Sequence, residues 1–292
     1  MKIDMVIVTY SPEPQLLIKA IESMIDQVRK IYIVDNTPDR SDILKSVNYK
    51  NVEVIYLDDN KGIAYAQNIG IKRSLFNKSD FIVLSDQDTI YPNNYIVNMI
   101  DKKDSFNKIA AIAPLFQDII GNNANEGFID KSLFGFKKIS PLRGYHEIFQ
   151  TIASGKILNS SYLQTIGLMD EMLFIDFVDL EWCWRANKKG YKIIGNADVL
   201  IIHQLGDEIV SLGNKNITLR SPIRHYYITR NTVYLGLYDN SLDRWHKMII
   251  FVKSFKYIIG FSLLSKPHLI HFKYTLLGFW HGITKKLGKF DG

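Results

Sequence analysis

The first half of the chain alternates short apolar runs with stretches of helical character. Apolar runs of strand length span residues 3–9, 31–34 and 52–57. Residues 12–27 place apolar side chains at helical spacing behind two prolines that suit a helix start, and residues 62–76 form the next predicted helix. Repeated strand–helix units of this kind predict an α/β fold with a mostly parallel central sheet.

The second half is less regular. Strands are predicted at residues 109–114, 148–154 and 199–202, with a polar, loop-like stretch over 121–144. Asn159, followed by two serines, is expected to cap a short helix. The sequence has no Gly-x-Gly-x-x-Gly pattern after its first strand and no P-loop, which disfavours a dinucleotide oxidoreductase and an NTPase.

One apolar run, residues 81–85, ends in two carboxylates, Asp86 and Asp88. Side chains at i and i+2 of an extended chain point the same way, so both should project from the carboxyl end of a buried strand, where open α/β sheets bind ligands. Close carboxylates repel each other unless a cation lies between them, commonly a hard divalent ion shared with substrate phosphates. The run therefore indicates metal-assisted chemistry on a phosphorylated substrate, although an isolated Asp-x-Asp is more often a solvated turn.

Positive charge is concentrated near the end of the chain. Between Arg244 and Phe290 there are nine basic residues and no acidic one, and subtracting these charges from the net +6 leaves −3 for the rest. A basic segment suits nucleic acid or an anionic membrane surface. The aromatic and aliphatic residues around these charges favour the membrane and not nucleic acid, and no stretch offers the ~18 uncharged apolar residues of a spanning helix.

The single cysteine and the N-terminal residues bear on the compartment. Cys183 has no partner for an internal disulfide, which fits a reducing environment. The chain runs directly from Met1 into a strand-like segment and shows no signal peptide. We therefore expect a cytoplasmic protein that associates peripherally with the inner membrane.

A series of motifs follows along most of the chain. They are Val8-Thr9-Tyr10, Asp35-Asn36, the run from Asn60 to Gly70, Ser85-Asp86-Gln87-Asp88, the run from Phe174 to Arg185, His203-Gln204-Leu205-Gly206, Arg224-His225-Tyr226-Tyr227 and Arg230-Asn231. In this order they resemble the inverting family 2 glycosyltransferases, which have a GT-A fold, and most closely the bacterial rhamnosyltransferase branch. One departure is Val178-Asp179, where many members have Glu-Asp; the rhamnosyltransferase-like branch often has this form.

The resemblance implies a role for each candidate residue. Asp88 and His203 would bind a divalent metal, Mg²⁺ or Mn²⁺, and imidazole ligation would favour Mn²⁺. Asp179 would be the catalytic base that deprotonates an acceptor hydroxyl. The residues implied in binding the nucleotide-sugar are Thr9, Tyr10, Asp35, Asn60, Gly62, Asn68, Asp86 and Arg230.

The implied enzyme is a metal-dependent inverting glycosyltransferase. It would move L-rhamnose from dTDP-rhamnose to a lipid-linked oligosaccharide acceptor for O-antigen or capsule synthesis, and the donor sugar rests on the branch resemblance alone. The implied architecture is a GT-A nucleotide-sugar-binding domain over residues 1–220 and a helical, basic, amphipathic region over 221–292. That second region would bind the inner face of the membrane or mediate homo-oligomerisation.

Two other functions fit parts of the sequence. Asp86-x-Asp88-Thr89 resembles the nucleophile motif of haloacid-dehalogenase-like phosphatases, although that motif usually ends the first strand of its domain and three predicted strands precede it here. A non-catalytic nucleotide-sugar-binding subunit would share the binding motifs without needing a base. Asp179 could then be only an acidic residue in the first turn of a helix, and His203 only a core histidine.

Overall fold

The computed structural model of the chain describes residues 1–39, 42–101, 106–118, 127–203, 208–212 and 215–292. Eight strands form one sheet in the order β3-β2-β1-β4-β9-β5-β10-β8. Their bounds are β1 Ile3–Thr9, β2 Lys30–Asp35, β3 Val52–Tyr56, β4 Phe81–Asp86, β5 Ile109–Asp118, β8 Tyr145–Ile148, β9 Ile157–Asn159 and β10 Lys192–His203. Two hairpins stand apart from it, β6 Phe128–Ser132 with β7 Gly135–Ile139 and β11 Glu208–Leu212 with β12 Lys215–Leu219.

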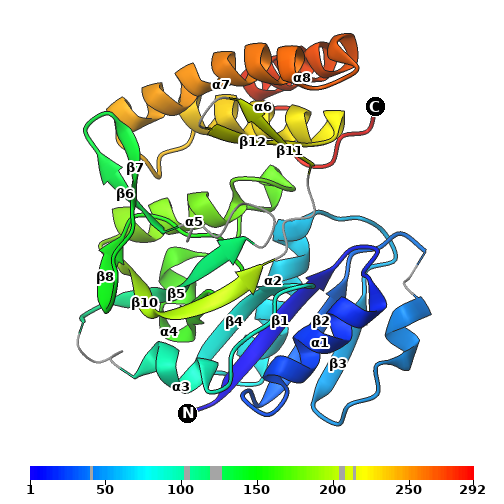
Figure 1. Cartoon of the computed structure of the whole chain (residues 1–292), viewed down its shortest axis with the longest axis vertical. Coiled ribbons are helices and arrows are strands. Elements are labelled where there is room, and N and C mark those ends of the chain that lie inside the picture. Colours follow the sequence, from blue (N-terminus) through cyan, green and yellow to red (C-terminus); the bar gives the residue numbers. More distant parts are fainter. Residues whose placement is uncertain (40–41, 102–105, 119–126, 204–207, 213–214) are drawn as a thin grey trace.

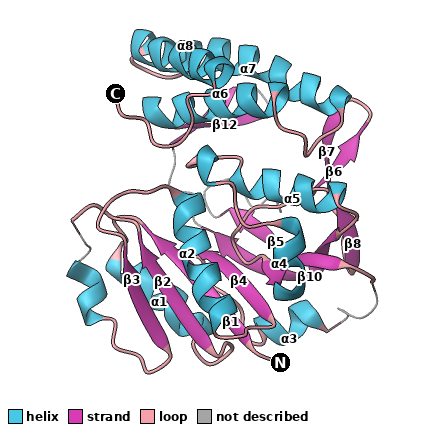
Figure 2. Ribbon diagram, turned by 180° about the vertical axis from the view of Figure 1, so that it is seen from behind, coloured by secondary structure: helices cyan, strands magenta, loops and turns pink. Residues whose placement is uncertain are grey.

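The helices cover both faces of the sheet and form a further layer beyond it. The α-helices are α1 Pro14–Met24, α2 Ile63–Phe76, α3 Tyr95–Ile100, α4 Ser160–Ile166, α5 Val178–Lys188, α6 Pro222–Leu237, α7 Arg244–Leu264 and α8 His268–Thr284, with short 3₁₀ turns at Asp42–Ser46 and Glu171–Leu173. Figures 1 and 2 show α1 and α3 on one face of the sheet and α2 and α5 on the other. Helices α6, α7 and α8 lie together above one end of the sheet, next to α5.

The first four strands confirm the predicted parallel arrangement. Strand β1 pairs in parallel with both β2 and β4, with Thr9 opposite Asp35 and Val8 opposite Asp86. Parallel strands in this register bring their carboxyl ends to one edge. The motif residues that follow each strand therefore meet at that edge, although they are far apart in the sequence.

Close packing of α2 onto β1 explains one glycine of the Asn60–Gly70 run. A Cβ at Gly70 would lie 2.3 Å from the Val6 Cγ1, a distance that real Cβ atoms essentially never show. Val6 is buried in the core on this face, while Met5 and Ile7 are buried on the opposite face against α1 and α3. Both faces of β1 are thus covered, which is why its sequence is an almost continuous apolar run.

Two predictions for the middle of the chain are wrong. The predicted loop at 121–144 contains the hairpin of β6 and β7, and α7 fixes it because Trp245 Nε1 donates to the Leu133 carbonyl at 2.6 Å. The predicted strand at 148–154 ends at Ile148, and residues 151–156 instead turn beneath the end of β4. The predicted cap is confirmed, since Asn159 Oδ1 accepts from the Ser161 N–H at 3.1 Å at the start of α4.

Helix α6 joins the helical layer to the rest of the fold. Asn231 Nδ2 donates to the carbonyls of Ile175 at 2.8 Å and Leu173 at 3.0 Å, in the loop before α5. On its other side α6 packs closely on α8, because a Cβ at Gly278 would lie 2.5 Å from the Tyr226 carbonyl oxygen. Among the described residues, none of the helices combines the length and apolar character needed to cross a membrane.

Candidate active site

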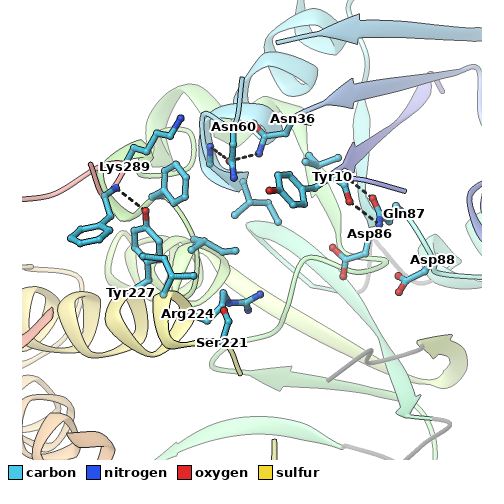
Figure 3. Close-up of a pocket in the computed structure, with 17 residues that line it drawn as sticks. Tyr10, Asn36, Asn60, Asp86, Gln87, Asp88, Ser221, Arg224, Tyr227 and Lys289 are labelled. Carbon is cyan, nitrogen blue, oxygen red and sulfur yellow. Dashed lines mark hydrogen bonds between the residues drawn. The ribbon is translucent and has the colours of Figure 1, made fainter. Parts of the chain in front are cut away.

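A cavity of ≈ 740 Å³ opens between the carboxyl ends of β1, β2 and β4 and the helical layer (Figure 3). Five of the predicted site residues line it, namely Tyr10, Asn60, Gly62, Asp86 and Asp88. Its other walls come from the loop before α5, the start of α6 and the segment after α8. The fold therefore brings the strand-end motifs and the last third of the chain to one site.

Thr9 and Asp35 lie beneath the cavity surface and do not line the cavity. Thr9 Oγ1 donates to Asp35 Oδ1 at 3.0 Å, and both residues are buried. Tyr10, which follows Thr9, is half-exposed and faces the cavity, and its N–H donates to Gln87 Oε1 at 2.8 Å. The buried pair thus supports the end of β1, and Tyr10 presents the exposed surface.

Gly62 allows the loop before α2 to approach the loop before α5. Its φ of +89° lies in the region that favours glycine, and a Cβ there would be 2.6 Å from the Phe174 ring. Asn60 Oδ1 accepts from the Gly62 N–H and from Asn36 Nδ2, both at 3.0 Å. Asn60 and Gly62 therefore shape the cavity wall through the backbone.

Asn68 and Arg230, both predicted to bind the donor, lie outside the cavity. Asn68 Nδ2 donates to the Met169 carbonyl at 2.9 Å, and the Met169 N–H donates back to Asn68 Oδ1. Arg230 is fully buried, and its guanidinium donates to the carbonyls of Leu173 at 2.8 Å and Gly288 at 2.5 Å. Both side chains hold chain segments around the site in place, and neither lines the cavity where the donor would bind.

Asp86 and Asp88 face the cavity from the end of β4 (Figure 3). Ser154 Oγ donates to Asp86 Oδ2, and this contact holds that carboxylate beneath the strand end. Across the described residues, no three His, Cys, Asp or Glu side chains form a group that could hold a metal alone. Two carboxylates suit a divalent cation that takes its other ligands from water and a bound diphosphate, as Mg²⁺ commonly does.

Asp179 lies in the first turn of α5, close enough to interact electrostatically with Asp86 of the cavity lining. Burial raises the pKa of its carboxyl, the nearby Lys156 ammonium opposes that rise, and the Asp86 carboxylate adds to it. Its Oδ1 atom is sealed from solvent and has no hydrogen-bond partner in the described part of the chain. A half-buried carboxylate with an unused acceptor atom and a raised pKa has the properties of a general base.

Lys156 is a residue that sequence reasoning missed. Its side chain is fully buried, with Nζ 4.0 Å from Cys183 Sγ and 5.3 Å from the centre of the Trp182 ring. A lysine is almost never fully buried unless its charge is compensated. Its position beside Asp179 supplies that compensation, and nothing in the apolar sequence around it indicated this.

The loop before α5 is strained and tied to α6. Phe174, Asp176 and Phe177 all have φ between 63° and 66°, which is unfavourable for residues with a side chain. Arg224 of α6 holds the loop through Asp176, with Nε to Oδ2 at 2.9 Å and Nη2 to Oδ1 at 2.8 Å. Arg224 also lines the cavity, although it was not among the residues predicted to bind the donor.

His203 ends strand β10, but its side chain falls outside the part of the chain that the structure describes. The residues that follow it in the His203-Gln204-Leu205-Gly206 motif are likewise outside the described ranges. The metal-binding role of His203 therefore stays a prediction.

A mostly parallel sheet with an Asp-x-Asp pair facing a cavity at its carboxyl edge defines a glycosyltransferase of the GT-A type. Comparison with known proteins agrees: the sequence model described as "Glycosyl transferase family 2" matches residues 4–167. The chain is also 34% identical over 238 residues to the dTDP-rhamnosyl transferase RfbF of Shigella flexneri, covering 79% of this chain and 78% of that protein. The protein belongs to glycosyltransferase family 2.

Solved structures share the fold at low sequence identity. The chain superposes on GalNAc-T7, solved with UDP, GalNAc and Mn²⁺, with a TM-score of 0.62 at 14% identity, over 95% of this chain and 55% of that one. It superposes on residues 1–349 of S. aureus TarS, in complex with UDP-GlcNAc, with a TM-score of 0.60 at 16% identity, over 98% and 82%. The chain thus spans just over half of the first neighbour and most of the second. Family membership sets aside the phosphatase alternative for Asp86 and Asp88.

Proposed function

We propose that this enzyme transfers L-rhamnose from dTDP-rhamnose to a lipid-linked oligosaccharide during surface polysaccharide synthesis. The observation that supports this reaction is the cavity, because Asp86 and Asp88 line it and the half-buried Asp179 carboxylate interacts electrostatically with Asp86. The choice of donor is supported by the likeness to RfbF, whose name specifies a dTDP-rhamnosyl transferase.

Each group has a defined task in this proposal. Tyr10 and Asn60 contact the nucleoside, Thr9 and Asp35 support them, and Asp86 contacts the ribose or the sugar. Asp88 holds the divalent cation, Mg²⁺ or Mn²⁺, and His203 is the predicted second ligand. When bound, such a cation supplies positive charge that neutralises a leaving diphosphate.

Asp179 performs the proton transfer. Its carboxylate takes the proton from the acceptor hydroxyl while that oxygen attacks the anomeric carbon and the bond to the diphosphate breaks. A single displacement from the opposite face inverts the anomeric centre. No carboxylate is needed as a nucleophile, which distinguishes this scheme from a double displacement.

Calorimetry with a panel of donors tests the choice of nucleotide and sugar. We expect dTDP-rhamnose to bind most tightly, in the presence of Mg²⁺ or Mn²⁺, among dTDP-, UDP- and GDP-activated sugars. Tighter binding of a UDP- or GDP-sugar would overturn the donor while leaving the reaction class intact. Nucleotide binding without any transfer to lipid-linked acceptors would favour the non-catalytic subunit.

The helical layer offers a surface for the membrane that would carry this acceptor. Helices α7 and α8 expose eleven large apolar side chains, which are Trp245, Met248, Val252, Phe255, Ile259, Leu263, Leu269, Ile270, Phe272, Leu276 and Trp280. Lysines are interspersed with them and no acidic residue occurs between Arg244 and Phe290. Basic amphipathic helices with aromatic residues lie in the plane of an anionic bilayer, and each cation adds about 1 kcal/mol near its surface. We infer peripheral attachment at the inner face of the membrane.

Vesicle sedimentation tests the attachment. We expect the full-length protein to sediment with phosphatidylglycerol-containing vesicles at low salt, to be released at high salt, and to bind more weakly when Trp280 is replaced by alanine. Leu142→Ala is the control, because Leu142 is 95% exposed but lies outside the helical layer. Full-length protein that ignores these vesicles, or that forms dimers which Trp280→Ala disrupts, would assign the surface to self-association instead.

A further inference from the structure

The segment after α8 returns to the cavity and is held there at several points. We define the strap as residues 286–290. The Gly288 N–H donates to the Met172 carbonyl at 2.9 Å. The Phe290 N–H donates to the Tyr227 hydroxyl at 2.8 Å (Figure 3). With the Arg230 bond to Gly288, these contacts tie the strap to α6 and to the loop before α5.

Two side chains of the strap line the cavity, Lys289 and Phe290. The Phe290 ring lies 4.5 Å from the Tyr226 ring and 6.0 Å from the Tyr274 ring, centre to centre, so aromatic packing fixes it. Lys289 also reaches the loop before α2, where its Nζ lies 2.7 Å from Asp59 Oδ1. The strap therefore closes the side of the cavity next to Asn60 and Gly62.

Two lysines meet one aspartate where the strap reaches the loop before α2. Lys61 Nζ lies 3.2 Å from Asp59 Oδ2, so two ammonium groups share a single carboxylate. The two lysines lower the pKa of Asp59 to about 2, which keeps it ionised. If Lys289 turns toward a ligand in the cavity, Lys61 still compensates Asp59. Lys289 can therefore leave Asp59 and bind a ligand while the Asp59 carboxylate stays paired with Lys61.

We propose that Lys289 of the strap contacts the nucleoside diphosphate of the donor at the Asn60 side of the cavity and that Phe290 forms the adjoining wall of the donor site. This inference rests on the proposed function, because it takes a nucleoside diphosphate as the ligand. It assigns a binding role to a segment more than two hundred residues away in sequence from Asp59 and Asn60.

Calorimetric binding of dTDP to the full chain, with Mn²⁺ present, tests the proposal. We expect Lys289→Met to weaken dTDP binding about tenfold or more, the usual effect of losing a hydrogen bond to a charged group. Lys286→Met is the matched control, since Lys286 is an exposed lysine of the same strap that does not line the cavity, and it should bind like wild type.

Asp59→Asn separates donor contact from simple anchoring of the strap. If Lys289 contacts the bound nucleotide, Asp59→Asn should leave dTDP binding unchanged or tighten it. An equal loss in Asp59→Asn and Lys289→Met, or wild-type binding by Lys289→Met, would overturn the proposal. These outcomes concern the strap alone, whereas a wild-type protein that binds none of dTDP, UDP and GDP would overturn the proposed function as well.

Discussion

Replacing Asp179 with asparagine should lower turnover by about 10²–10⁴-fold while donor affinity stays near that of the wild type. Asparagine keeps the shape of the side chain but cannot accept the proton of an acceptor hydroxyl. Because Asp179 is not among the residues that line the cavity, we expect the change to remove no direct contact with the nucleotide. Single-turnover kinetics together with donor calorimetry would measure both quantities.

The pH dependence of this step follows from the raised pKa of Asp179. The carboxylate must be ionised to act as a base, so turnover should fall as pH drops through a value above that of an ordinary aspartate. Between its unfolded and folded pKa values the folded state binds the proton more strongly, so this residue's contribution to stability decreases as pH rises through that interval. The charged groups that set the position of the interval are Lys156, which lowers the pKa, and Asp86, which raises it.

Asp198→Asn is a suitable control for Asp179→Asn, because Asp198 is an exposed aspartate away from the cavity lining. It should show wild-type turnover and an unchanged acid limb of the pH profile. Near-normal turnover in Asp179→Asn would show that Asp179 only begins a helix. Detection of a glycosylated aspartate by mass spectrometry would argue against inversion in one step.

Replacing Asp88 with alanine should reduce turnover by roughly 10³-fold, since the neutralisation of a leaving diphosphate by a metal contributes several kcal/mol. Donor binding should weaken in the presence of Mg²⁺ or Mn²⁺. The fold should persist, because Asp88 is half-buried at the cavity edge and not in the core. Excess EDTA added to the wild-type enzyme should give the same loss.

Asp101→Ala provides the control for this experiment, since Asp101 is exposed at the end of α3. Thermal unfolding of both variants would show that neither change disrupts the fold. Full wild-type activity in excess EDTA would show that the enzyme needs no divalent cation, and would contradict the proposal that Asp88 holds one.

The strands that carry the site could be predicted because their signals are local. Runs such as Phe81–Asp86 are apolar on both faces and end in polar residues, so the sequence alone indicates a buried strand and its end. The parallel pairing of β1 with β2 and β4 agrees with the predicted strand–helix units, whereas the order of the strands in the sheet comes from the structure. The predicted ends of these strands therefore agree with the structure to within a residue or two.

The features that were missed depend on contacts between distant parts of the chain. The β6–β7 hairpin is held by Trp245, more than a hundred residues further on, and a local pattern cannot show that. Arg224 and Arg230 lie on the same helix, but Arg224 lines the cavity and Arg230 is buried against the Leu173 carbonyl. The sequence does not show which side of α6 faces the cavity. Likewise, Lys289 lies in a segment whose charge pointed to the membrane, and its return to the cavity is a tertiary contact.

Helix α6 sets a limit on how this enzyme can be recombined with its relatives. One side of α6 carries Arg224 and Tyr227 to the cavity, and the other meets Gly278 of α8 almost backbone to backbone. A chimera that exchanges α7 and α8 to change the proposed membrane surface must therefore keep small residues opposite α6 and retain the strap. A crossover placed at residue 243 would exchange Lys289 and Phe290 of the cavity lining together with the exposed apolar side chains of α7 and α8, so the two features cannot be exchanged independently.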